Sequence, residues 1–192
     1  MCRLIRDGVD TVKVLSLSDE LGVSRSSFYW HFKSRQDLLD ALLDGWQAKN
    51  TAGLIAQAEA PAATITEAVC QIFRCVFDTR LFDTALDFAV RDWARRAPKV
   101  RAALEASDHQ RLAALSAMYA RHGYEPLEAE TRARVLYYMQ IGYTDNDLGE
   151  PLQERLRRLP SYLYCFTGRE AQPQELSAFT AFVIGIRGED GQ

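Results

Sequence analysis

The 192-residue sequence predicts an all-α protein, on the strength of its composition, its few helix breakers and its apolar spacing. Hydrophobic residues make up 47% of the chain and aromatic residues 10%, which is enough for a folded core. Only 6 Pro and 11 Gly are present, and apolar residues recur every three or four positions, the helical period. A net charge of −3 excludes a polycation that coats nucleic acid without selectivity.

The most informative stretch begins with a helix expected over residues 11–21, in which Val14, Leu17 and Leu21 share one face. Gly22 follows it and can adopt the positive φ that a sharp turn between two helices requires. The pattern predicts the first half of a helical hairpin.

A second, short helix is expected after Ser24, whose hydroxyl can cap the free amides of the first turn. Phe28 and Phe32 are spaced to anchor this helix inward, and Trp30 is also assigned to packing. Between residues 21 and 36 the chain has basic residues but no acidic one. A short helix with a polar N-terminal end and an apolar underside suits the major groove of DNA. The segment therefore predicts a helix-turn-helix that binds double-stranded DNA.

We expect several outward-facing side chains of this segment to contact the DNA backbone. Tyr29 and His31 can offer a phenol and an imidazole to phosphates or to a thymine methyl group. Lys33 and Arg35 flank the start of the next helix, where free amides and the helix dipole already favour a phosphate.

Motif residues of this stretch lie at characteristic spacings: Gly8, Leu17, Leu21-Gly22-Val23-Ser24, Tyr29-Trp30-His31-Phe32, Ser34-Arg35 and Leu38-Leu39. Through them, residues 8–46 resemble the tetracycline-repressor-like (TetR) family of one-component regulators; after residue 50 only length and helical pattern agree. The resemblance implies an all-α homodimer that binds a palindromic operator and releases it when a small molecule occupies the second domain. It also implies that Arg25, Ser26 and Ser27 reach base edges, with Arg25 able to donate two hydrogen bonds to a guanine.

Two features depart from the family pattern. Only seven residues precede Gly8, where family members usually carry a full first helix, and Lys13 stands where they usually have a Ser or Thr cap. A helix-turn-helix needs a third helix across its back. We therefore expect that the natural reading frame continues upstream of Met1, or that this domain is poorly ordered.

A longer helix is expected to open at Ser34, with Asp37 completing a capping box, and no linker interrupts its apolar stripe before Asn50. We expect a DNA-binding domain over residues 1–46, joined rigidly to a ligand-binding and dimerisation domain over residues 47–192, which is predicted to be a helical bundle. Further helices are expected over 64–77, 82–97, 99–122, 126–142 and 173–187, with a looser region over 144–160.

Large apolar residues of the second domain either form its core or line a pocket for an unknown small-molecule effector. The candidates for the pocket are Phe73, Phe77, Trp93, Tyr119 and Tyr138.

The last helix carries small residues every four positions, Ser177, Ala181 and Gly185, on a helix that is apolar almost all round. Small residues in one row let a second helix approach closely. This pattern favours a homodimer built as an intersubunit four-helix bundle with segment 127–142; the alternative is a core helix within one chain.

No pattern in the chain indicates catalysis. Asp83, Asp87 and Arg91 are spaced as an exposed ladder of helix ion pairs; the alternative, a carboxylate pair for acid–base or metal chemistry, has no His nearby in sequence. Residues 145–149 do not match a calcium loop and are expected to form a polar loop. The sequence predicts no metal site, no cofactor and no enzymatic activity.

The leading interpretation is a DNA-binding transcriptional regulator, a repressor released from its operator by a small molecule. The alternatives are a small all-α binding protein or enzyme with an incidental helical hairpin, and a DNA-binding protein whose second domain serves only for dimerisation. The N-terminus has no apolar signal region, and no uncharged 18-residue stretch exists, so we expect a cytoplasmic location and no membrane partner.

Overall fold

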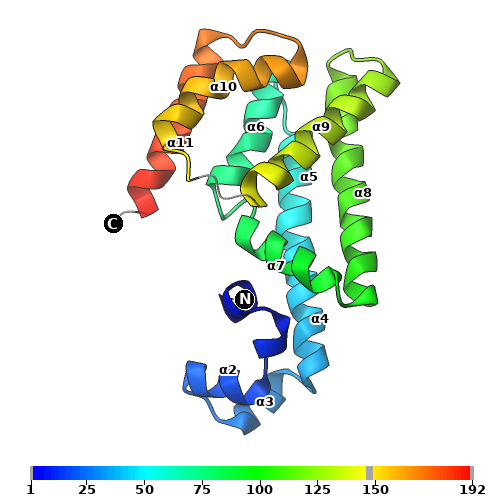
Figure 1. Ribbon diagram of the computed structural model, residues 1–192, viewed down its shortest axis with the longest axis vertical. Helices are drawn as coiled ribbons and strands as arrows, with labels where there is room; N and C mark the ends of the chain where they lie inside the picture. Colours follow the sequence, from blue (N-terminus) through cyan, green and yellow to red (C-terminus); the bar gives the residue numbers. More distant parts are fainter. Residues whose placement is uncertain (1, 146–148, 191–192) are drawn as a thin grey trace.

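The computed structural model describes residues 2–145 and 149–190, and the side chains of all of these except Leu15, Arg25, Asp145 and residues 187–190. Throughout the described residues the regular elements are helices, which confirms the predicted all-α class (Figure 1). In chain order they are α1 (Cys2–Asp7), α2 (Val14–Leu21), α3 (Arg25–His31), α4 (Arg35–Trp46), α5 (Ala52–Glu59), α6 (Ile65–Phe77), α7 (Thr84–Ala94), α8 (Pro98–Arg121), α9 (Pro126–Asp145), α10 (Leu152–Thr167) and α11 (Pro173–Asp190). A short 3₁₀ turn, η1 (Val9–Thr11), precedes α2, and a π-helical turn, η2 (Gln47–Thr51), joins α4 to α5.

The helical hairpin lies at one end of the molecule (Figure 1) and forms as the sequence predicts. Gly22 has a φ of 63° and ends α2. The Ser24 hydroxyl accepts a hydrogen bond from the Ser27 amide at 3.1 Å and caps α3. The helix expected over 11–21 begins only at Val14, because the chain first makes the η1 turn, in which Thr11 Oγ1 donates to the Gly8 carbonyl at 2.8 Å.

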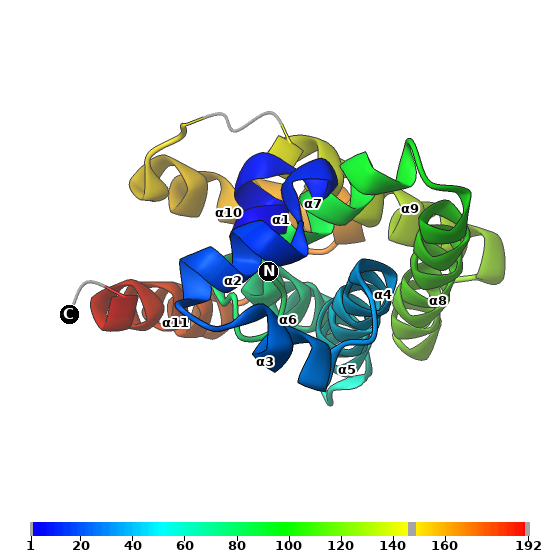
Figure 2. The ribbon, with the colours of Figure 1, turned by 90° about the horizontal axis from the view of Figure 1, so that it is seen from below.

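The short α1 supports this hairpin from one side only. Its Leu4 is fully buried in a cluster with Val9, Val12 and Phe28. The helix packs mainly against η1 and α7 rather than across the tip of the hairpin (Figure 2). Leu21, which we expected on the packed face of α2, lies at that tip and is 70% exposed.

One continuous helical rod connects the hairpin to the rest of the molecule (Figure 1). Ser34 caps α4 by accepting from the Asp37 amide at 3.1 Å, which confirms the predicted capping residue. The rod runs through η2 into α5 without a break. A π turn of this kind places one extra residue in the helix, and it buries Asn50 and Thr51.

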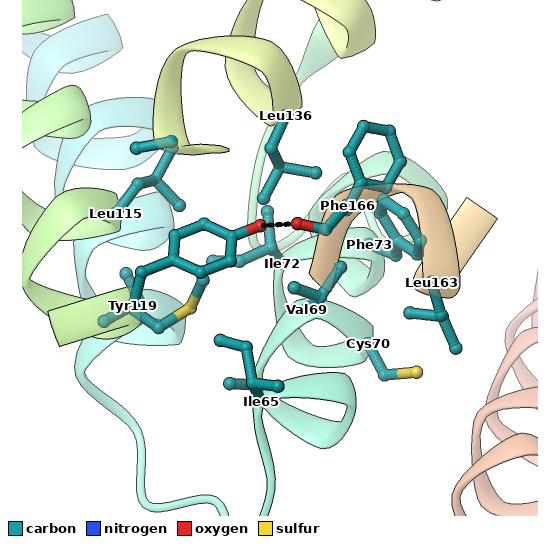
Figure 3. Close-up of a cluster of buried hydrophobic side chains, with 14 of the residues drawn as sticks. Ile65, Val69, Cys70, Ile72, Phe73, Leu115, Tyr119, Leu136, Leu163 and Phe166 are labelled. Atoms are coloured by element: carbon teal, nitrogen blue, oxygen red, sulfur yellow. Dashed lines mark hydrogen bonds between the residues drawn. The ribbon is translucent and has the colours of Figure 1, made fainter. Parts of the chain in front are cut away.

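The remaining helices form a bundle around a core centred on α6 (Figure 3). Helix α6 is capped by Thr64, as predicted, and buries most of its circumference. Val69, Ile72 and Phe73 meet side chains from α8, α9, α10 and α11 in this core. Figure 3 shows Tyr119 from α8 directing its hydroxyl at the Phe166 carbonyl of α10, 3.4 Å away.

Helix α10 corrects the looser region expected over residues 144–160. It begins at Leu152 and contains Pro160, which the sequence analysis took as the end of a loop. Leu152, Leu156, Leu159 and Leu163 are spaced by four, three and four residues and face the core. Pro160 lies on the exposed side of this helix. The polar loop expected over 145–149 falls mostly on residues outside the described part of the chain.

A search of the described residues found no helix with the length and hydropathy needed to cross a bilayer.

Candidate nucleic-acid interface and ligand cavities

Helix α3 lies at one end of the molecule (Figure 1), and its outer surface presents polar side chains to solvent. Ser26, Ser27, Tyr29 and His31 are exposed, and the Ser24 and Ser26 hydroxyls lie 2.7 Å apart. The backbone of Arg25 starts the helix, but its side chain lies outside the described residues. The first turn of α3 is therefore open to a ligand from the solvent side.

The underside of α3 is anchored by aromatic packing, as predicted. Phe28 is buried, and its ring centroid lies 5.4 Å from that of Phe32. Tyr29 packs edge-on against Phe28, with ring centroids 5.4 Å apart. This packing fixes the height at which the Tyr29 hydroxyl stands above the surface.

Trp30 does not pack, and our prediction for it was wrong. Its side chain is 85% exposed. The seven-residue α3 has room for only one inward face, which Phe28 occupies. Together with the exposed Leu21 and Val23, Trp30 gives the hairpin an apolar surface beside its polar one.

Arg35 has a role that the sequence analysis did not assign. Its Nε donates to the Val12 carbonyl at 2.6 Å and its Nη2 donates to the Val9 carbonyl at 2.8 Å. These bonds tie the start of α4 to η1 across more than twenty residues of sequence. The neighbouring Lys33 has an exposed side chain at the junction of α3 and α4.

A buried polar network joins the helical rod to the bundle, and Asp87 of α7 is its centre. Asp87 is 3% exposed. One carboxylate oxygen accepts from Trp46 Nε1 at 2.8 Å and from Arg111 Nη1 at 3.0 Å, and the other accepts from Arg91 Nε at 2.9 Å. The exposed ion-pair ladder predicted for Asp83, Asp87 and Arg91 is therefore wrong. Four-residue spacing aligned these side chains, but the aligned face points into the protein.

The network extends to α8, α9 and the π turn. Arg111 is fully buried and donates to Thr51 Oγ1 from Nε at 3.2 Å and from Nη2 at 3.0 Å. The Tyr137 hydroxyl donates to Asp108 at 2.7 Å and accepts from Arg111 at 3.1 Å. Asn50 adds a second tie to α7, donating to the Asp83 carbonyl at 2.8 Å and accepting from the Asp83 amide at 3.0 Å.

Ion pairing sets the charge state of the network. Burial alone would raise the pKa of Asp87, but the guanidinium groups of Arg111 and Arg91 outweigh burial and hold that pKa below its usual value. Burial raises the pKa of the Tyr137 phenol above its ordinary value, so this group stays protonated and can donate to Asp108. The network thus holds the ionised Asp87 carboxylate and the Arg91 and Arg111 guanidinium groups together at neutral pH.

Two cavities lie side by side in the bundle and share Val76 and Gln140 as a common wall. The first lies among α6, α9, α10 and α11, and its lining is mainly aromatic and aliphatic: Phe73, Val76, Phe77, Met139, Gln140, Tyr143, Arg155, Leu156, Leu159, Tyr162 and Phe179. The second lies beside α7, and the network residues Asp87 and Tyr137 are part of its lining. Asp87, which accepts a hydrogen bond from Trp46 at the end of α4, is thus also part of a cavity wall.

Comparison with known proteins agrees with the hairpin geometry. Residues 3–42 match the model of the family described as bacterial regulatory proteins, tetR family. Over 43 residues the chain is 42% identical to the tetracycline repressor protein class A from transposon 1721 of Escherichia coli, which is 22% of this chain and 20% of that protein. The N-terminal domain is a TetR-family domain. The chain spans about a fifth of the length of this curated relative.

The likeness in fold extends beyond the TetR-family domain. The crystal structure of Mycobacterium smegmatis AmtR aligns with 95% of this chain and 89% of its own, with a TM-score of 0.57 and 19% identity. At this identity the likeness concerns the fold alone.

The five residues predicted to line a pocket lie in different parts of the structure. Phe73 and Phe77 line the first cavity. Trp93 packs in the cluster that joins the TetR-family domain to α7, and Tyr119 is fully buried in the bundle core. Tyr138 is half-exposed on the outer side of α9. Sequence reasoning missed Arg155 and Tyr162, because the helix that carries them lay in or beyond the expected loop.

The row of small residues on α11 faces solvent in the single chain. Ser177, Ala181 and Gly185 are exposed, and a Cβ added to Gly185 would meet no atom within 4 Å. Phe179 and Val183 form the buried side of the same helix. The small-residue row is therefore accessible to a second helix from another molecule.

Proposed function

We propose that this chain is a DNA-binding transcriptional repressor that acts as a homodimer on a palindromic operator and is released by a small-molecule effector. The observation that carries the proposal is the TetR-family match over residues 3–42, which coincides with a hairpin whose α3 presents its polar side chains to solvent. A regulator of this kind acts where the DNA lies, so the proposal includes a cytoplasmic location and no enzymatic activity.

The exposed surface of the hairpin supports a division of roles on the DNA. Arg25, Ser26 and Ser27 stand on the first turn of α3, the part of a recognition helix that reaches base edges. Lys33 lies at the N-terminal end of α4, where backbone amides favour a phosphate. Arg35 positions α4 through its two carbonyl bonds rather than acting mainly as a phosphate contact.

Tyr29 and His31 would also contact the DNA backbone. Both side chains are exposed on the same short helix as the base-reading positions. Phosphate contacts of this kind set the register of a protein on the duplex without reading its sequence.

Two exposed surfaces support a homodimer. The row Ser177, Ala181 and Gly185 on α11 is open to close helix packing. Leu127 and Val135 of α9 are large apolar side chains that are more than half exposed. Exposed apolar side chains and open rows of small residues are typical of surfaces that pack against another chain.

Release by an effector is supported by the position of Asp87. This side chain lines the second cavity and also holds Trp46 at the end of α4. A ligand that shifts the cavity wall would therefore shift the rod that carries the DNA-binding hairpin. A homodimer needs its two hairpins about one helical turn of DNA apart, so a small displacement of the rods disrupts binding.

The test is DNA binding by the purified chain. Fluorescence anisotropy with a randomised duplex pool, followed by sequencing of the bound fraction, should select a palindrome. Affinity should fall steeply with salt, because phosphate contacts release counterions. Lys33→Ala should reduce the slope of log affinity against log salt by about one unit, while Arg101→Ala, which removes an exposed arginine from α8, should leave the slope unchanged. A chain that shows no salt-dependent binding to any duplex would contradict the proposal.

A further inference from the structure

One charged residue lies in the otherwise mainly apolar wall of the first cavity. Its described lining is aromatic and aliphatic apart from Gln140, two tyrosines and a single charged residue, Arg155 of α10. A cation placed against an apolar cavity is costly unless something compensates its charge.

Arg155 is held between two aromatic rings. Its guanidinium carbon lies 4.5 Å from the ring centroid of Phe77 and 5.4 Å from that of Tyr143. Cation–π contacts of this kind orient a guanidinium and stabilise it, but they use the faces of the rings and leave its N–H donors free. The group is therefore fixed in place with donors to spare.

Within the described part of the chain, no carboxylate pairs with Arg155 and no acceptor takes a hydrogen bond from its guanidinium. Two other arginines of α10 do have carboxylate partners. Arg157 pairs with Glu154 at 2.7 Å, and Arg158 pairs with Glu150. Glu150 also accepts from the Tyr143 hydroxyl, so its carboxylate already has two partners.

The cavity beside Arg155 opens to solvent, and the empty space in it, counting the open mouth, is about 480 Å³. Phe73, Tyr162 and Phe179 add ring surfaces to the walls. An aromatic ring would lie among them with one end toward the mouth.

We propose that this cavity binds small aromatic carboxylates, with the ring against the aromatic walls and the carboxylate paired with Arg155. A guanidinium fork matches two carboxylate oxygens, and the pair would neutralise a charge with which no carboxylate of the described residues pairs. That such an acid is the effector rests on the proposed function. Its binding to this cavity can be tested without DNA.

The experiment is isothermal titration calorimetry of the whole chain with three acids, benzoate, 3-phenylpropionate and 2-naphthoate, each matched with its primary amide. The acids should bind about 10- to 100-fold more tightly than their amides, the advantage that hydrogen bonds to a charged group provide. Arg155→Met keeps much of the apolar stem and should remove that advantage. Arg157→Met, on the exposed side of the same helix, should leave it unchanged.

Equal affinity for acids and amides, no binding of any of the six compounds, or the same loss in both arginine variants would overturn the proposal. The melting temperature of each ligand-free variant shows whether the helix remains folded. Operator binding without ligand is measured separately. A chain that binds the acids but no duplex DNA would keep the site and contradict the proposed function, and the converse result would contradict the site alone.

Discussion

Trp46 Nε1 donates a hydrogen bond of 2.8 Å to Asp87, joining the last residue of α4 to the middle of α7. The indole is fully buried, and the Arg111 guanidinium lies 5.0 Å from its ring centroid. Trp46 ends the helix that begins beside the α2–α3 hairpin, and Asp87 lines a cavity in the bundle. Asp87 is therefore one of the contacts between the two parts of the molecule.

Replacing Asp87 should be among the most destabilising single changes in the chain. Asp87→Ala leaves the fully buried Arg111 guanidinium without its ion-pair partner, and breaking a buried pair in this way costs about 3–5 kcal/mol. Trp46→Phe removes the hydrogen bond and part of the fully buried indole, so it should cost about 2–4 kcal/mol. Urea unfolding followed by circular dichroism measures both values.

Asp92→Ala is the matched control for that prediction. Asp92 lies on the same helix and pairs with Arg96, but both side chains are more than half exposed. Solvent screens such a pair, so the free energy of unfolding should hardly change. Equal effects of Asp87→Ala and Asp92→Ala would show that the buried network contributes little.

The pH dependence of stability should report the ion pairs of Asp87 with Arg111 and Arg91. Because the pKa of Asp87 is held below its usual value by Arg111 and Arg91, its ionised form stabilises the folded chain at any pH above the unfolded pKa of about 4. That contribution is lost as the pH falls through the lower folded pKa. The difference in unfolding free energy between wild type and Asp87→Asn should be constant from about pH 5 to 7 and should shrink below about pH 4. A difference that grows on acidification would contradict this assignment.

Local chemistry made much of the fold predictable. Ser24, Ser34 and Thr64 each cap the helix expected after them, because a cap depends only on residues within one turn. Gly22 takes the positive φ that the hairpin requires. The recognition segment was found for the same reason: its signals lie within a short stretch of chain.

Long-range partners made the rest unpredictable. The spacing of Asp83, Asp87 and Arg91 is the same for an exposed ladder and for a buried face, and only Trp46 and Arg111, 41 and 24 residues from Asp87, decide between them. The cavity residues of α10 were missed for another reason. Pro160 was interpreted as the end of a loop, although the leucine spacing on both sides of it is helical.

Arg35 gives a prediction that separates structural support from phosphate binding. Because its guanidinium bonds to the Val9 and Val12 carbonyls, Arg35→Ala should free η1 and weaken binding to all DNA sequences alike, while the salt slope stays unchanged. Hydrogen exchange should show loss of protection around residues 9–17. Arg25→Ala is the counterpart, and should relax base preference at one position of each half-site without that loss. A salt slope lower by about one unit in Arg35→Ala would instead identify a phosphate contact.

Gly53 on α5 lies against the loop that precedes α7. A Cβ at this position would stand 2.1 Å from the Leu81 carbonyl oxygen, far inside contact distance, and backbone on both sides resists the shift. Gly53→Ala should therefore cost about 1–3 kcal/mol, the usual cost of overpacking. Gly142→Ala on α9, where an added Cβ meets no atom of the described residues within 4 Å, should instead stabilise the chain by about 0.5–1 kcal/mol. Thermal melts of the two variants should move in opposite directions.

Assembly through α11 gives the last prediction. Ala181→Arg puts a long charged side chain into the exposed row between Ser177 and Gly185, where close helix packing needs small residues. The chain itself should remain folded, because Ala181 is exposed and the buried side of α11 is unchanged. Sedimentation velocity should then show a monomer, and affinity for a palindromic operator should collapse to that of a single half-site. Ala113→Arg makes the same substitution on the exposed side of α8 and should leave both dimer and affinity intact. If Ala181→Arg remains dimeric, the interface lies on another surface, and the exposed Leu127 and Val135 of α9 are the next positions to test.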